Sequence, residues 1–323
     1  MLVRRRRGWE LPEAAATPES IYLSRRALIG AGAGLIGAAA FGIPATASAA
    51  AEPAGDPSAA LYPAPMNPRY TLDRPVTPEA KSSVVNNYYE FSYAKNVAPA
   101  MGRFQRRPWR IAIDGLVEKP QEMDIDDLLK KVHLEERLYR HRCVEAWSMA
   151  IPWTGFPMSA LVELARPTSA AKFIRMESFR DPKMAPNQRD FRYPWPYVEG
   201  VTLKEAQNEL AFLVTGAYGK PAPGQFGAPL RLALPWKYGF KSAKGIVRFT
   251  FTDTQPVSFW EEVQGAEYGF WANVNPRVPH PRWSQASEED IATGERRPTL
   301  LFNGYADDVA PLYAGMESQR IWY

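Results

Sequence analysis

Three segments of the chain alternate between hydrophobic and polar residues, which predicts strands. They are residues 109–115, 173–178 and 245–252. A period of two places every second side chain on one face of a sheet, so each segment is expected to bury one face. In the last segment the side chains expected on the buried face are those of Val247, Phe249 and Phe251.

Apolar runs and short helical patterns complete the prediction. A further strand is expected at 138–144, and residues 209–215 and 230–234 form apolar runs. Short helices are expected at 124–129, where Asp124 is the cap, and at 159–165. Many short strands with few short helices indicate an α+β or mostly β fold rather than a doubly wound one. No GxGxxG or GxxxxGK[ST] motif is present to indicate a dinucleotide or P-loop site.

The N-terminus has the pattern of a twin-arginine signal peptide. Arg25 and Arg26 precede an uncharged stretch rich in Gly and Ala, and a small-residue A-x-A sequence follows. Cleavage is expected after Ala49, with Ala47 as the alternative, so residues 1–49 form the signal. The apolar stretch is too short and too weakly hydrophobic for a membrane span, which needs about 20 apolar residues. This pattern predicts export to the periplasm by the twin-arginine translocase, which carries folded, often cofactor-loaded proteins.

Removal of the signal changes the charge of the chain. The full sequence has a net charge of +4, and residues 1–49 hold six Arg and three Glu, which leaves +1. No run of basic residues remains to follow a phosphate backbone, so a nucleic acid is not an expected partner. Residues 50–80 are rich in Pro and Ala and are expected to form an extended, poorly ordered leader. Residues 81–323 contain no linker-like break, which favours a single domain.

Cys143 is the only cysteine in the sequence, and Arg140, His141 and Arg142 precede it. Without a partner in its own chain, it is a core residue, an intermolecular bridge or a functional thiol. Nearby positive charge favours the thiolate, which is both a nucleophile and a soft metal ligand. A Cys–His hydrolase is a further alternative, and the histidines that it draws on are His133, His141 and His280.

A segment rich in Gly and Pro spans residues 219–244 and holds several cations in tight backbone shapes. The basic residues are Arg231, Lys237, Lys241 and Lys244. Such fixed cations suit a phosphate-bearing ligand, and a solvated basic loop is the alternative. The block at residues 86–91, Asn-Asn-Tyr-Tyr-Glu-Phe, offers amides, phenols and a carboxylate to a polar heterocycle, or forms a turn before a strand.

Residues 86–91, residues 143–149 and the 219–244 segment together resemble the sulfite-oxidase-type molybdoenzymes. More closely, they are similar to the catalytic subunits of the bacterial protein-methionine-sulfoxide reductases. Further matching blocks lie at residues 194–200, 268–276, 280–286 and 298–306. The resemblance covers nearly all of the mature chain and implies an α+β, sulfite-oxidase-type molybdopterin-binding fold, with mixed sheets and short helices.

The resemblance also implies a Mo-molybdopterin cofactor, with Cys143 as the ligand to molybdenum. The residues that it places on the pterin are Asn86, Tyr89, Glu90 and Ser178, the last standing where a relative has Thr. The residues that it places around the phosphate are Arg231, Ser242, Ala243 and Lys244. Phe226 stands where the family pattern has Asn, so only a backbone contact is expected from it. Asn87 and Glu145 are expected near the metal, where Glu145 tunes polarity or relays protons.

The implied reaction is oxygen-atom transfer from methionine sulfoxide in oxidised periplasmic proteins, which repairs them. Large substrates require an open site, and the aromatic residues expected at its opening include Trp236, Tyr238 and Trp271. The sequence has no C-x-x-C-H haem motif and too few cysteines for an iron–sulfur cluster, so an external electron donor is needed. The resemblance implies a membrane haem b subunit that draws on the quinone pool. The alternatives are a sulfite oxidase-like oxidoreductase and an exported binding protein without catalysis.

Overall fold

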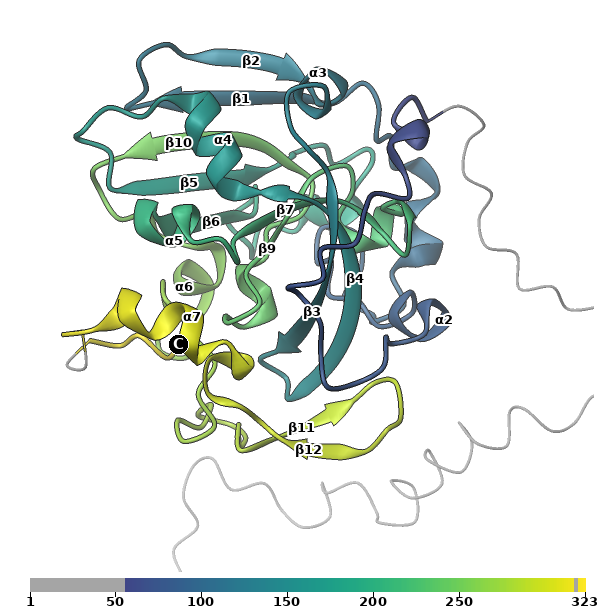
Figure 1. Cartoon of the computed structure of the whole chain (residues 1–323), viewed down its shortest axis with the longest axis vertical. Coiled ribbons are helices and arrows are strands. Elements are labelled where there is room, and N and C mark those ends of the chain that lie inside the picture. The colour runs from purple at the N-terminus through teal and green to yellow at the C-terminus, as the bar shows by residue number, and fades with distance from the viewer. Residues whose placement is uncertain (1–55, 317–318) are drawn as a thin grey trace, which may run out of the picture. The chain divides into compact units, whose positions relative to one another are not determined.

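Two β-sheets make up the framework of the described chain (Figure 1). The computed structural model describes residues 56–316 and 319–323, so the predicted signal at residues 1–49 lies outside the described residues. Within these ranges no helix is both long enough and apolar enough to cross a membrane. The prediction of an α+β fold with mixed sheets and short helices is confirmed.

The first sheet has five strands in the order β2-β1-β10-β5-β6. β1 and β10 are parallel, whereas the other neighbouring pairs are antiparallel. The strands are β1 (Arg110–Gly115), β2 (Gln121–Asp124), β5 (Phe173–Ser178), β6 (Val198–Thr202) and β10 (Ile246–Thr252). The strands predicted at 109–115, 173–178 and 245–252 are therefore confirmed as β1, β5 and β10.

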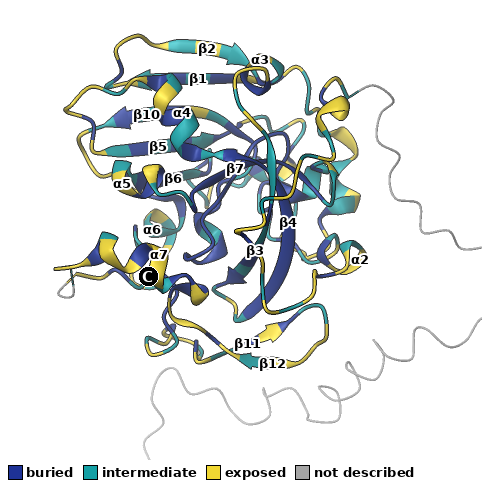
Figure 2. Ribbon diagram, viewed as in Figure 1, coloured by how far each residue is buried: buried dark blue, intermediate teal, exposed yellow. Residues whose placement is uncertain are grey.

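The second sheet has seven strands and carries the predicted metal ligand. Its central path is β12-β11-β4-β7-β8, with β3 paired to β4 and β9 paired to β7. The strands are β3 (Glu135–Cys143), β4 (Trp147–Pro157), β7 (Phe212–Ala217), β8 (Lys220–Pro221), β9 (Arg231–Ala233), β11 (Ser287–Asp290) and β12 (Arg296–Pro298). All of β4 except its last residue is buried, as is the whole of β7 (Figure 2), so this pair lies in the core.

The helices are short and lie between the strands. The α-helices are α2 (Glu79–Ser82), α3 (Ile125–Leu129), α4 (Met158–Ala165), α5 (Leu203–Gln207), α6 (Phe259–Gln264) and α7 (Ala306–Val309). The 3-10 helices are η2 (Ala59–Leu61), η3 (Ala98–Arg103), η4 (Pro186–Arg189), η5 (Gly224–Phe226), η6 (Gly239–Lys241), η7 (Leu301–Gly304) and η8 (Ala310–Tyr313). Asp124 caps α3 as predicted, since its carboxylate accepts a hydrogen bond from the Asp126 N–H at 3.0 Å.

One prediction about β10 is wrong. Phe249 and Phe251 are buried as expected, but Val247 is only half-buried and Ile246 takes the buried position. The register against β5 shifts between Ile246 and Arg248, which makes Val247 the extra residue of a β-bulge. A bulge moves the alternation by one position, and the sequence period alone does not reveal it.

The Pro-rich leader is packed where the structure describes it. Tyr62 donates from its hydroxyl to Thr215 Oγ1 at 2.8 Å, Tyr70 is buried, and the Asn67 N–H donates to the Glu136 carbonyl at 2.8 Å. Residues 56–80 therefore lie on the domain rather than forming a poorly ordered leader. The expected boundary at residue 81 does not mark where packing begins, because Met66 already forms a parallel bridge with Glu136 of β3.

A buried ion pair fixes η6 against the first sheet. Lys241 Nζ lies against the Glu199 carboxylate, and both side chains are fully buried. The Tyr197 hydroxyl, which comes from the segment before β6, donates to the Phe240 carbonyl at 2.6 Å. These contacts hold Gly239 and Phe240 in the wall of the cavity described next.

Candidate active site

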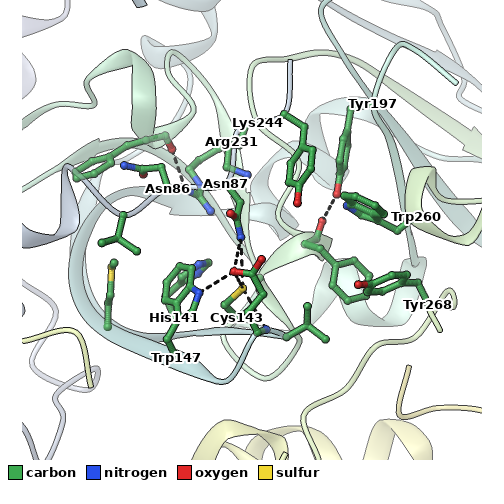
Figure 3. Close-up of a pocket in the computed structure, with 18 of the residues that line it drawn as sticks. Asn86, Asn87, His141, Cys143, Trp147, Tyr197, Arg231, Lys244, Trp260 and Tyr268 are labelled. Atoms are coloured by element: carbon green, nitrogen blue, oxygen red, sulfur yellow. Dashed lines mark hydrogen bonds between the residues drawn. The ribbon is translucent and has the colours of Figure 1, made fainter. Parts of the chain in front are cut away.

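A cavity of about 600 Å³ opens beside the turn between β3 and β4 (Figure 3). Its walls come from the segment after α2, from β3 and β4, from the Gly/Pro-rich segment and from residues 260–283. The predicted site residues that line it are Asn86, Asn87, Tyr89, Glu90, Cys143, Glu145, Phe226, Arg231 and Lys244. Segments that are far apart in the sequence are therefore brought to one place, as the resemblance implied.

Cys143 lies at the end of β3, where a tight turn leads into β4. It pairs with Trp147 in the antiparallel register, and the Ala146 N–H donates to the Cys143 carbonyl at 3.1 Å. Ala146 has a φ of 64°, which is uncommon for a residue with a side chain. The turn folds Glu145 back over the sulfur, so that the Glu145 N–H donates to Sγ at 3.5 Å.

The expectation that the basic residues beside Cys143 in the sequence favour its thiolate is wrong. Side chains alternate along a strand, so His141 and Cys143 face the cavity, while Arg140 and Arg142 lie on the other side. Arg142 Nε donates to Glu288 Oε2 at 2.7 Å, and Arg140 Nη2 donates to Asp73 Oδ1 at 2.7 Å. Burial, and secondarily the charge of Glu145, raises the pKa of the Cys143 thiol to about 12.

His141 is a neutral neighbour of this thiol. Burial first, and then the charges of Arg231 and Lys244, lower the pKa of His141 to about 3. A neutral imidazole supplies no positive charge to stabilise a thiolate. A bound metal ion is the cation that would do so, and a metal-bound thiol is deprotonated.

Glu145 is held over the sulfur by several donors. Its Oε2 accepts from Trp147 Nε1 at 2.9 Å, from Asn87 Nδ2 at 3.3 Å and from Lys95 Nζ. The thiol Sγ lies 3.6 Å from the same oxygen. Burial acts to raise the pKa of Glu145, but the bonds from Lys95, Trp147 and Asn87 outweigh it and hold the pKa below its ordinary value.

Two cations lie in the wall of the cavity. Arg231 and Lys244 both line it, and neither forms an ion pair with any residue in the described part of the chain. Burial lowers the pKa of Arg231 to about 10, and burial together with the charge of Arg231 lowers that of Lys244 to about 8. Burial also raises the pKa of Glu90 to about 7, against the charge of Lys244. Two buried cations without ion pairs favour an anionic ligand.

Gly227 leaves room for the Lys244 side chain in the wall of the cavity. Its φ is 97°, and a Cβ at this position would lie 2.7 Å from Lys244 Cγ. Only glycine adopts this backbone shape readily and leaves Lys244 its place. The neighbouring Phe226 accepts from Arg231 Nη1 at 2.8 Å through its carbonyl, so its backbone orients a cation while its ring lines the cavity.

Three predicted residues do not line the cavity. Ser178 ends β5 and is buried, and within the described chain its Oγ has no hydrogen-bond partner. Ser242 and Ala243 are buried directly after η6, where the Ala243 carbonyl accepts from the Leu232 N–H at 2.9 Å. They form the backbone that leads to Lys244 rather than part of the cavity surface.

The aromatic wall of the cavity differs from the expected one. Trp236 is buried and donates from Nε1 to the Tyr313 hydroxyl at 2.7 Å, and neither Tyr238 nor Trp271 lines the cavity. The aromatic residues that do line it include Trp147, Trp153, Tyr197, Trp260, Tyr268 and Trp283. Tyr197, Tyr268 and Trp283 lie in blocks that carry the family resemblance, so the resemblance could have indicated them as site residues.

Two sequence comparisons identify the family. Residues 98–260 match the family model described as the oxidoreductase molybdopterin binding domain. The chain is also 47% identical over 325 residues to the protein-methionine-sulfoxide reductase catalytic subunit MsrP of Pseudomonas syringae pv. tomato, across 95% of this chain and 96% of that protein. The chain belongs to this reductase family. A weaker structural likeness, with a TM-score of 0.44 and 18% identity, links this family member to the sulfane dehydrogenase SoxCD from Paracoccus pantotrophus. It covers 67% of this chain and 57% of that chain.

The cavity of this reductase-family chain fits the molybdopterin group that the family implies. Its wall holds a thiol, which is a soft metal ligand once deprotonated, and two buried cations without ion pairs in the described residues. In the described residues no group of three or more His, Cys, Asp or Glu side chains is placed to hold a metal ion. A metal ligated by one thiolate, with its remaining ligands on an anionic organic group, matches this donor set.

Proposed function

We propose that this protein reduces methionine sulfoxide in oxidised periplasmic proteins, using Mo-molybdopterin. The observation that carries the proposal is the cavity itself, whose wall holds Cys143 together with Arg231 and Lys244, two cations without an ion pair in the described residues. Its identity of 47% to a protein-methionine-sulfoxide reductase catalytic subunit supports the substrate class. The bound group would supply the oxygen-atom transfer chemistry, and the protein positions it and controls access.

We assign the predicted site residues as follows. Cys143 binds the metal, and Asn87 and Glu145 lie beside the sulfur. Asn86, Tyr89 and Glu90 face the pterin, and Arg231 with Lys244 holds the phosphate. The residues that shape the backbone or second layer around the group are Ser178, Phe226, Ser242 and Ala243.

The charge beside the sulfur supports a sulfoxide rather than sulfite as the substrate. The Glu145 carboxylate lies 3.6 Å from Sγ, and the charges of Arg140 and Arg142 are engaged elsewhere. Glu145 is itself paired with Lys95, so this ion pair offers no uncompensated cation to an anion such as sulfite, whereas a sulfoxide is neutral. This arrangement favours the reductase over the sulfite oxidase-like alternative.

We propose that electrons come from a membrane haem b subunit and, through it, from quinone. The sequence lacks a haem attachment motif, an iron–sulfur cysteine set and a dinucleotide fingerprint of its own. We also propose that residues 1–49 direct export of the folded protein to the periplasm by the twin-arginine translocase. The paired arginines before an uncharged stretch support this route.

Metal analysis combined with three substrates tests the proposal. Purified wild-type protein should contain molybdenum, and the Cys143→Ser protein should contain much less. With a chemical electron donor, the wild type should reduce oxidised casein and free methionine sulfoxide, and with a chemical electron acceptor it should oxidise sulfite only slowly. Absence of molybdenum from the wild type would indicate a non-catalytic binding protein, and turnover of sulfite alone would favour the oxidase.

A further inference from the structure

Lys95 lies outside the predicted site, yet it contacts two residues that flank the metal ligand. Its Nζ donates to Asn87 Oδ1 at 2.5 Å and forms an ion pair with Glu145. Both partners lie against Cys143, since Asn87 Nδ2 is 3.5 Å and Glu145 Oε2 is 3.6 Å from Sγ. The ammonium group therefore contacts two residues, Asn87 and Glu145, each of which contacts the sulfur.

The donor and acceptor pattern fixes the Asn87 amide in one orientation. An ammonium group only donates, so the amide atom that faces Lys95 must be the oxygen. The amide nitrogen then faces Cys143 Sγ and Glu145 Oε2, which both accept. The amide thus directs an N–H at the sulfur, and hydrogen bonds to a ligating sulfur tune the bound metal.

Lys95 also balances charge beside the sulfur. Glu145 places a carboxylate next to a group that becomes a thiolate when it ligates a metal. Two adjacent negative charges repel each other unless a cation lies close. Other cations are near, but Arg142 is bonded to Glu288, so Lys95 is the cation that pairs with Glu145.

We propose that Lys95 is a positioning residue, which orients Asn87 and Glu145 toward the Cys143 sulfur and supplies the balancing positive charge. The inference rests on the proposed function in so far as Cys143 binds the metal. Removing a positive charge near a metal favours its oxidised form. The Lys95→Met substitution should therefore shift the reduction potential of the bound molybdenum to a more negative value.

The test is a redox titration of the molybdenum-loaded enzyme, followed by electron paramagnetic resonance. The Lys95→Met enzyme should show a more negative potential, an altered spectrum and a lower kcat, with a nearly unchanged KM. The Lys95→Arg enzyme keeps the charge and the donors, so it should retain the wild-type potential. The matched control is Lys220→Met, because Lys220 pairs with Glu79 at 2.9 Å with similar exposure, and neither residue lines the cavity.

The outcomes separate this inference from the proposed function. If the wild type holds no molybdenum, the proposed function fails. If the wild type is loaded and the Lys95→Met enzyme keeps the wild-type potential and spectrum, the role of Lys95 is wrong. Loss of metal from Lys95→Met but not from Lys95→Arg would support the role of the charge, and loss from both would overturn it.

Discussion

Lys237 Nζ lies 2.6 Å from Glu205 Oε1, and the two side chains are 1% and 2% exposed. Glu205 Oε1 also accepts from the Tyr313 hydroxyl at 2.6 Å, and Lys237 Nζ donates to Asn273 Oδ1 at 2.9 Å. The pair therefore connects the Gly/Pro-rich segment, which carries the cations of the cavity, to α5 and the C-terminal region. The position of the Gly/Pro-rich segment, and with it the shape of the cavity, therefore depends on this ion pair.

Breaking this buried pair should destabilise the protein strongly. The Glu205→Gln substitution leaves the Lys237 ammonium buried without its counter-charge, which costs about 3–5 kcal/mol. Urea unfolding should report this loss. The Lys237→Met/Glu205→Gln double variant removes both charges and should recover part of it. Equal losses from the single and double variants would contradict the account.

The same pair predicts a pH dependence of stability. Burial acts to raise the pKa of Glu205, but Lys237 and Tyr313 outweigh it, so the folded-state pKa lies below the ordinary 4.5. A carboxyl with a lowered pKa stabilises the fold fully above about pH 4.5, and this contribution is lost as the pH falls through the folded-state value. The difference in Tm between wild type and Glu205→Gln should therefore narrow as the pH falls below about 4.5.

Lys244 should lower the stability of the cofactor-free protein. It is a buried cation without an ion pair, so Lys244→Met should stabilise the cofactor-free protein by about 1 kcal/mol. The same variant should retain less molybdopterin when it is purified from cells that make the cofactor. Thermal unfolding and pterin analysis measure the two effects. Lys237→Met is the matched control, because its cation is paired and its removal should lower the Tm.

Glu145 should control the choice between neutral and anionic ligands. Glu145→Gln removes the negative charge beside Sγ, so inhibition by sulfite should tighten by about tenfold, which corresponds to about 1.4 kcal/mol. Glu267→Gln tests whether any carboxylate in the cavity wall has this effect, since Glu267 also lines the cavity and, like Glu145, is in an ion pair, with Arg282 at 2.7 Å. An unchanged inhibition constant in the Glu145 variant would show that this carboxylate does not exclude anions.

The bulge in β10 predicts an unequal response at two adjacent positions. Ile246 is fully buried, so Ile246→Ala should cost about 3 kcal/mol of unfolding free energy. Val247 is half-buried, so Val247→Ala should cost about 1 kcal/mol or less. Chemical denaturation of the two variants is sufficient, and the reverse order would place Val247 in the core.

Local sequence patterns predicted the strands well, because burial on one face leaves a period of two. The same period explains an error at the site, since Arg140 and Arg142 lie opposite to Cys143 on β3 and pair with Asp73 and Glu288. Burial of the thiol outweighs the charge of Arg142, so the pKa of Cys143 is raised. It also predicts His141 on the cavity side. The bulge at Val247 and the partner of Lys95 depend on contacts between segments far apart in the sequence, which no local pattern contains.

The last part of the chain completes the surroundings of Cys143. Trp283 Nε1 and Gln285 Nε2 each donate to the Val144 carbonyl at 2.7 Å, and Glu288 accepts from Arg142. β11 pairs in parallel with the start of β4, next to the turn that carries the sulfur. Nearly the whole polypeptide must therefore be synthesised before these contacts around Cys143 can form. A chain that ends before residue 283 would lack these contacts, so we expect it to leave the surroundings of Cys143 incomplete.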